Sequence, residues 1–292
     1  MLRPLLTSVA IASILGAASP ALSQTYEWKI GTGNARPHPA IAMADYIKEQ
    51  VETATDGDIE VTVYTIGQLG TQADMIENTS LGAVDMVVQI VGNAVPFIQE
   101  FQIFNFYYMF ADYGQYRKVI DPEGPLFAYF EEQVADKLNS RLYTLSSGGV
   151  RSMSNSAREI DEPGDIEGLN MRASSPITQR QWQALGALPF AVGFDEQYTA
   201  LQTGLIEGTE NSLSAHAGSK IYEVAPYLTL TEHEFMTTFV MASEISMSKL
   251  PEEYQEIIAK AATESGEIGM EAAIENDSKI VDELVAKYDI TV

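Results

Sequence analysis

The order of strand-like and helix-like segments in the first third of the chain constrains its fold more than any other feature. Residues 27–32 alternate like a strand, and residues 38–53 place apolar side chains at helical spacing. Residues 58–66 alternate with period two, and a helix-like stretch at 72–81 and a buried strand pattern at 84–90 follow them. Parallel strands need long connections, so this order predicts parallel pairing with crossover helices. We therefore expect an α/β fold.

The rest of the chain continues in the same style and ends in one long helix pattern. We expect these further elements: strands at 141–146, 169–173, 188–192 and 236–246, and helices at 178–185 and 197–203. Pro251, followed by two glutamates, is a favourable helix start, and apolar residues keep helical spacing from there to Val285. No flexible linker pattern interrupts the sequence. We expect two α/β lobes with a hinge and a ligand cleft between them, braced by this long helix.

The first 24 residues, MLRPLLTSVAIASILGAASPALSQ, have the pattern of a secretory signal. One basic residue, Arg3, precedes an apolar run at 5–18, and small residues come before the predicted cleavage site. The run is too short to span a bilayer comfortably. We expect a cleaved signal peptide at 1–23. The chain has no cysteine, which excludes disulfides and a lipid anchor at the junction and favours a periplasmic protein.

Charge and motif content exclude several functions. The chain has 17 Lys and Arg against 41 Asp and Glu, and its formal net charge of −24 argues against nucleic acid and anionic membranes as partners. The histidines, His38, His216 and His233, lack the neighbouring carboxylates of a zinc signature. No Gly-x-Ser-x-Gly element occurs, and no nucleophile, base and orienting residue form a set. We expect no catalytic residue, no metal and no cofactor; an exported enzyme is the less favoured alternative.

Two arginines, Arg151 and Arg172, lie inside short strand-like pieces with neutral neighbours. Arginine is suited to grip a planar carboxylate through two parallel N–H donors, so each is a candidate for an anion site. Each could instead pair with an acid across a sheet, and the pattern alone favours that interpretation. Asn34 and His38 lie in the turn after the first strand, where α/β sheets collect ligands; a solvated loop is the alternative there.

Five stretches of the chain carry a family resemblance. They are GQLGTQADMIENTSLGAVDM at 67–86, GGVRSMSNSAREI at 148–160, IEGLNMRASSP at 166–176, ALGALPFAVGFDEQYTALQTGLIEGTEN at 184–211 and KIYEVAPYLTLTEH at 220–233. Together they resemble the DctP-type substrate-binding proteins of tripartite ATP-independent periplasmic (TRAP) transporters. The stretches keep the order of that family and extend through almost the entire mature chain.

The resemblance implies a two-lobe, class II periplasmic-binding-protein-like fold with mixed sheets flanked by helices. Lobe I would comprise 24–148 and about 237–276, and lobe II would comprise 149–236 and about 277–292. Such proteins bind an organic acid anion in the cleft, without chemistry, and deliver it to the small and large membrane subunits of a permease. We expect a monomer whose ligand is a sugar acid or a dicarboxylate. An exported sensor or scavenger without a permease is the alternative.

The resemblance also implies ligand contacts. Arg172 occupies the position of the arginine that grips the ligand carboxylate in the family, and Arg151 matches the arginine of the G-x-R-x-x-S-N element. Asn211 and Phe194 match an asparagine and an aromatic residue in the motifs of the second lobe. We expect four first-lobe residues to read the other end of the ligand: Gln89, Asn93, His38 and Asn34. A sialic acid is less favoured as ligand, because the acidic residue that sialate-binding members present near Gln89 is absent.

The chain departs from the family pattern at several positions. Ser212, beside a position that contacts the ligand, stands where the family often has proline. Glu159 and Thr209 stand where proline and glutamine are common in the family. Family chains usually continue with another strand and helix, so we expect the sequence to be truncated at Val292.

Overall fold

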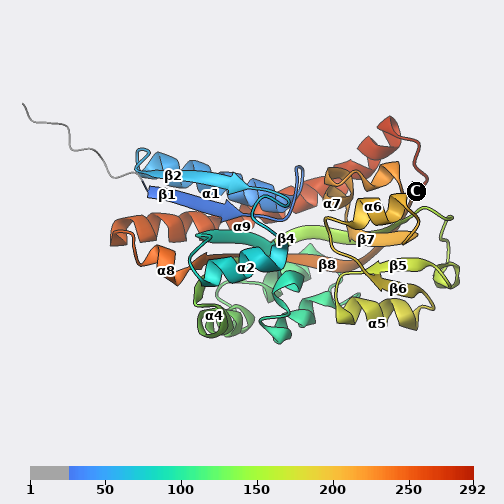
Figure 1. The fold of residues 1–292 in the computed structure, drawn as a ribbon, viewed down its shortest axis with the longest axis horizontal. Helices are drawn as coiled ribbons and strands as arrows, with labels where there is room; N and C mark the ends of the chain where they lie inside the picture. Colours follow the sequence, from blue (N-terminus) through green and yellow to red (C-terminus); the bar gives the residue numbers. More distant parts are fainter. Residues whose placement is uncertain (1–25) are drawn as a thin grey trace, which may run out of the picture.

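Within residues 26–292, which the computed structural model describes, eight strands form one continuous mixed sheet (Figure 1). Their order across the sheet is β2-β1-β3-β8-β4-β7-β5-β6. The strands are β1 Tyr26–Gly31, β2 Ile59–Tyr64, β3 Met86–Ile90, β4 Ser140–Asn155, β5 Asn170–Ala173, β6 Leu188–Ala191, β7 Gly208–Ser212 and β8 Tyr227–Ser243. The signal peptide expected at 1–23 lies outside the described residues.

Helices flank this sheet on both faces (Figure 1). The α-helices are α1 Pro39–Ala54, α2 Gln72–Ser80, α3 Tyr113–Val119, α4 Pro125–Leu138, α5 Pro176–Ala184, α6 Gln197–Gln202, α7 Leu213–Gly218, α8 Glu244–Met247 and α9 Glu252–Lys287. Short 3₁₀ helices are η1 Val91–Ala94, η2 Gln99–Asn105, η3 Pro163–Ile166 and η4 Ile221–Glu223. The expected α/β fold with a long helix near the C-terminus is confirmed.

The half of the sheet that contains β1, β2 and β3, which we call the first half, follows the predicted strand–helix order. β1 pairs in parallel with β2 and β3, and α1 and α2 form the crossovers. On one face, Trp28, Ile47 and Ile258 belong to a core that joins these strands to α1 and the start of α9. On the other face, Phe101 and Phe130 stack within a second core. The two cores hold β3 in place, and residues that follow β3 reach the site described below.

Two long antiparallel strands, β4 and β8, run through both halves of the sheet. Their register shifts at three places, and the middle shift lies between Ser147 and Val150, where Gly149 has a φ of +99°. This backbone conformation favours glycine, and a shift of this kind bends the strand. On one side of the shift, β8 joins β4 to β3, and on the other side β4 pairs with β7. The irregularity therefore lies at the junction of the two halves.

The sequence predicted only part of these two strands, at 141–146 and 236–246. The parts that were missed carry buried polar residues, among them Arg151 and Glu234, in place of apolar alternation. At its C-terminal end, β8 stops at Ser243, because the Ser243 side chain caps α8. The prediction that the strand continues to residue 246 is therefore wrong.

α9 crosses one face of the sheet from the region of α8 to that of α7 (Figure 1). It begins directly after Pro251, as predicted, and contacts α1, β4 and α7. Ser146 in β4 donates its hydroxyl to the Gly266 carbonyl at 2.6 Å. Further along α9, Asp277 accepts the Val150 N–H at 3.0 Å. The helix is thus bonded to β4 on both sides of the register shift.

The close packing of α9 on β4 is testable at Gly269. A methyl group there would lie 2.5 Å from Met43 Sδ and 2.7 Å from Ser146 Oγ. We expect Gly269→Ala to lower the free energy of unfolding by about 1–3 kcal/mol, although alanine favours helices over glycine by about 1 kcal/mol. Urea unfolding measures this change. Ser146→Ala removes one clashing atom, so Gly269→Ala should cost less in that background; equal costs in both backgrounds would contradict the packing argument.

His38 caps α1 from a fully buried position. Its Nδ1 accepts the Ala40 N–H at 3.1 Å, which requires a neutral ring. Burial, with a smaller effect of the Arg151 guanidinium, lowers the pKa of His38 from 6.5 to about 3. Below pH 6.5 the unfolded chain therefore binds a proton that the native state binds only near pH 3.

This difference predicts a pH dependence of stability. As the pH falls from 6.5 towards 3, the free energy of unfolding should decrease, by up to about 1.4 kcal/mol per pH unit from this group. His38→Asn keeps a capping acceptor that does not titrate, so its decrease should be shallower. Chemical unfolding at a series of pH values measures both proteins, and identical slopes would refute the assignment to His38.

Candidate functional site

A small cavity lies between the two halves of the sheet, where β3, β4, β5 and β7 come together. Its volume is about 40 Å³. The first half of the chain contributes Gln72, Ile90, Gly92, Asn93 and Asn105, and the second half contributes Arg151, Arg172, Ser174, Ser175, Phe194 and Asn211. The lining therefore combines two guanidiniums with neutral amides and hydroxyls.

Strand ends and the turns that follow them position these side chains. Arg172 lies in β5 and Asn211 in β7, which are parallel neighbours. Asn93 lies in η1, directly after β3. Ser175 follows β5 and caps α5 by accepting the Thr178 N–H at 3.2 Å. The carboxyl ends of parallel strands are the usual ligand-binding edge of open α/β sheets.

Arg172 is a buried cation without an acidic partner. Its side chain donates the Nε–H to the Val192 carbonyl at 3.0 Å, and among residues 26–292 no carboxylate oxygen lies within 4 Å of its guanidinium. Burial lowers the pKa of Arg172 to about 10, opposed by the charge of Glu210 and assisted by that of Arg151. Arg172 therefore stays protonated at neutral pH. A buried charge without a partner is unfavourable, so an anion at this position would be stabilised.

Arg151, in contrast, is paired with acids inside the protein. It donates its Nε–H to Glu210 Oε2 and an Nη2–H to the Glu210 carbonyl at 3.0 Å, and Glu234 Oε1 lies 3.8 Å from Nε. Burial opposes the charged form of Arg151, but the two acids raise its pKa above the ordinary value. Burial also opposes the charged form of Glu210, and Arg151 more than compensates and lowers the pKa of that carboxyl. Pairing across the sheet, the alternative considered above, thus holds for Arg151.

Glu234 completes a four-residue group with Arg151, Arg172 and Glu210, which we call the arginine cluster. Burial, with the nearby Glu210 charge, raises the pKa of Glu234 to about 8, although Arg151 and an Asn105 Nδ2–H at 3.2 Å oppose the shift. The environment of Glu234 therefore favours its protonated form. With Glu234 protonated, two guanidiniums face one ionised carboxylate, and the cluster carries one net positive charge. In a chain of net charge −24, this is a local site for an anion.

The eight residues predicted to contact a ligand divide into two sets. The cavity brings together five of them: Arg172, Arg151, Asn211, Phe194 and Asn93. The other three, Gln89, Asn34 and His38, are buried outside its lining. Gln89 donates to Met75 Sδ at 3.8 Å, Asn34 donates to Thr32 Oγ1 at 3.5 Å, and His38 caps α1. In this structure, residues of the first half line the cavity from α2, the end of β3, η1 and η2 instead.

Several residues of the site were not anticipated from the sequence. Ser174 and Ser175 directly follow the strand predicted at 169–173, so the strand-end rule that singled out Asn34 would also have found them. Glu210 adjoins the predicted Asn211, but acids are too common in this chain for its position to signal a role. Asn105, at the end of η2, has no sequence signal that distinguishes it.

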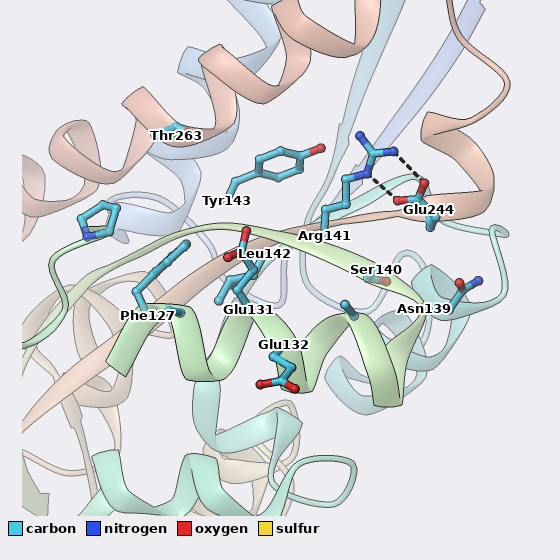
Figure 2. A pocket seen from close by; sticks show the side chains of 13 residues that line it. Phe127, Glu131, Glu132, Asn139, Ser140, Arg141, Leu142, Tyr143, Glu244 and Thr263 are labelled. Carbon is cyan, nitrogen blue, oxygen red and sulfur yellow. Dashed lines mark hydrogen bonds and ion pairs between the residues drawn. The ribbon is translucent and has the colours of Figure 1, made fainter. Parts of the chain in front are cut away.

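A larger cavity, of about 720 Å³, lies between α4, the start of β4 and α9 (Figure 2). Figure 2 shows Arg141 directed towards Glu244, and its Nη2–H donates to Glu244 Oε1 at 2.6 Å. Glu131 and Glu132 also line this cavity. Its one arginine is paired and its other charges are negative, so it does not attract an anion. The smaller cavity is therefore the candidate site, despite its size.

Between residues 26 and 292, no group of three or more His, Asp or Glu side chains is placed to hold a metal ion. No helix in the same range has the length and apolar character needed to cross a membrane.

The sequence matches one protein family over nearly all of the described chain. This family is the bacterial extracellular solute-binding proteins, family 7 (DctP), and the match covers residues 30–292. The C4-dicarboxylate-binding periplasmic protein DctP of Rhodobacter capsulatus is 30% identical over 275 residues, which cover 92% of this chain and 80% of that protein.

Solved structures show the same fold. The sugar acid binding protein of Advenella mimigardefordensis, in complex with galactonate, has a TM-score of 0.86 at 25% identity, covering 91% of this chain and 86% of that chain. A TRAP periplasmic solute binding protein of Roseobacter denitrificans, with bound L-galactonate, has a TM-score of 0.84 at 27% identity, covering 92% and 88%.

The comparisons agree with the fold and with the resemblance seen in the sequence. The family consists of solute-binding proteins and not of enzymes, as expected. The chain thus belongs to the DctP family of periplasmic solute-binding proteins of TRAP transporters.

Proposed function

We propose that this protein captures a small organic acid anion in the cavity around Arg172 and delivers it to the small and large membrane subunits of a TRAP permease. The observation that carries the proposal is the Arg172 guanidinium, which is buried and protonated and lacks an acidic partner among the described residues. A ligand carboxylate that accepts two parallel N–H bonds from Arg172 would supply the missing negative charge. Arg151, held by Glu210, would act mainly by placing a second positive charge nearby.

The relatives support an organic acid as the ligand. The Rhodobacter protein is named a C4-dicarboxylate-binding protein, and both solved structures above contain bound galactonate. In this chain, Asn211 and Phe194 lie in the same cavity as Arg172. We propose that the Asn211 amide donates to the ligand and that the Phe194 ring forms an apolar wall against its carbon chain.

Capture would require the two halves of the sheet to move apart. A cavity of about 40 Å³ has room for little more than a water molecule, so an organic acid cannot enter it without opening. We propose lobes of 24–148 with about 237–276, and 149–236 with about 277–292. The register shift at Ser147–Val150, with Gly149 at positive φ, supports a hinge at this boundary.

The same proposal places the protein's action in the periplasm. The relatives from Rhodobacter and Roseobacter are named as periplasmic proteins. The signal pattern at 1–23 supports export of this chain to the periplasm, as a monomer that meets its permease there. Genes for a small and a large membrane subunit beside this one would support the permease, and their absence would favour a sensor or scavenger.

The central test is removal of the Arg172 charge. A thermal-shift screen of sugar acids and dicarboxylates identifies the tightest ligand, and calorimetry then measures its affinity. We expect Arg172→Gln to weaken binding by about 100-fold or more, because each charge-assisted hydrogen bond contributes about 1.5–3 kcal/mol. Arg180→Gln is a matched control, since it removes the same charge from an exposed position in α5. Unchanged affinity in Arg172→Gln would refute the proposed site.

The raised pKa of Glu234 predicts that anion binding depends on pH. Above about pH 8 Glu234 ionises, and the arginine cluster then loses its net positive charge. Affinity for an anion should therefore fall as the pH rises through 8, by at most about tenfold per pH unit because one proton is linked to binding. Calorimetry from neutral to alkaline pH measures this. Glu234→Gln cannot ionise and should lack the dependence; the same dependence in both proteins would assign it to another group.

A further inference from the structure

Internal hydrogen bonds engage one end of each of several amide side chains in the cavity. Asn105 donates its Nδ2–H to Glu234 Oε1 at 3.2 Å, so Asn105 Oδ1 is left as an acceptor, and this oxygen is buried without a partner in the described chain. Asn93 donates its Nδ2–H to Gln72 Oε1, which leaves Asn93 Oδ1 as a second acceptor. The lining therefore presents two amide oxygens that a ligand donor could bond to, and the buried Asn105 Oδ1 lacks a donor in the described chain.

The same cavity also presents unused donors. Asn211 Oδ1 accepts the Ser212 N–H at 3.0 Å, which leaves the Asn211 Nδ2–H groups available. The Gln72 Nε2–H groups are available in the same way, because Gln72 Oε1 accepts from Asn93. A hydroxyl group both donates and accepts, and it can satisfy this mixture. An ionised carboxylate only accepts, and it cannot bond to Asn105 Oδ1 or Asn93 Oδ1.

Charge limits how many carboxylates the cavity can hold. Of the two lining arginines, Arg151 is neutralised by Glu210, and only Arg172 has no acid within 4 Å in the described chain. The lining contains no lysine and no further arginine. One ligand carboxylate would neutralise Arg172, the lining arginine without an acid partner in the described chain. A second would be buried beside amides without a countercharge, which is unfavourable.

We propose that the site selects a hydroxylated monocarboxylate, such as an aldonate, over a dicarboxylate, with Asn105 and Asn93 as the residues that determine this choice by accepting ligand hydroxyls. The inference rests on the proposed function and narrows its ligand class. The carboxylate binds at Arg172, and the hydroxylated chain extends towards the first half of the sheet. Arg172 thus determines that the ligand is an acid, and the two asparagines determine which kind of acid.

The experiment compares ligands that differ in one feature at a time. Calorimetry on the full-length exported protein, stripped of ligand by refolding, uses aldonates of four to six carbons. Each aldonate is paired with the aldarate of the same configuration, which adds a second carboxylate, and with the fatty acid of the same length, which lacks the hydroxyls. We expect the tightest aldonate to bind at least about tenfold more tightly than either of its partners. An aldarate, succinate or a fatty acid that binds more tightly than every aldonate would overturn the inference.

Variants separate this inference from the proposed function. Asn105→Leu and Asn93→Leu should each weaken aldonate binding by about tenfold while leaving the weak binding of the matched fatty acid nearly unchanged, because only the aldonate uses the amide oxygens. Thermal unfolding without ligand shows whether each variant is folded. If both asparagine variants bind aldonates like the parent, the specificity role fails while an acid-binding function still stands. If no organic acid binds the parent protein at all, the proposed function itself fails.

Discussion

The buried Arg172 guanidinium is the constraint on which the rest of the site depends. Its burial would be unfavourable without compensation, and the protein offers only the Val192 carbonyl as a nearby partner among the described residues. Arg151, a neighbour of similar burial, shows the alternative, because Glu210 and Glu234 lie against it. One arginine is thus paired inside the protein, and the other has N–H groups that we propose bind an external anion. Protonation of Glu234, which its environment favours, would make the balance of charge positive.

The architecture holds this site between two halves that share their longest elements. β4 and β8 pass through both halves, and α9 is bonded to β4 on either side of the register shift, through Gly266 and Asp277. A pair of halves linked by three elements cannot slide freely past one another. Bending at the shift is the motion that we propose for this connectivity, and it would change the width of the cavity directly.

The fold could be predicted largely from the sequence, and the site in part. Apolar periodicity located β1, β2, α1 and α2, because each buries one apolar face, and a continuous apolar run located β3, which is buried on both faces. It failed where strands are buried with polar side chains: residues 147–155 of β4 and 227–235 of β8 lack an alternating apolar pattern. Family motifs placed Arg172 and Asn211 in the cavity but could not show that Glu210 pairs with Arg151, since that contact joins strands distant in sequence. Gln89 and His38 are polar residues near strand ends whose side chains the packing directs elsewhere.

The small volume of the cavity has a kinetic consequence for the proposed capture. A ligand larger than this cavity could leave only after the two halves separate, so separation would be a necessary step of release. A membrane partner that binds the two halves only while they are apart would be enough to make release fast and one-directional.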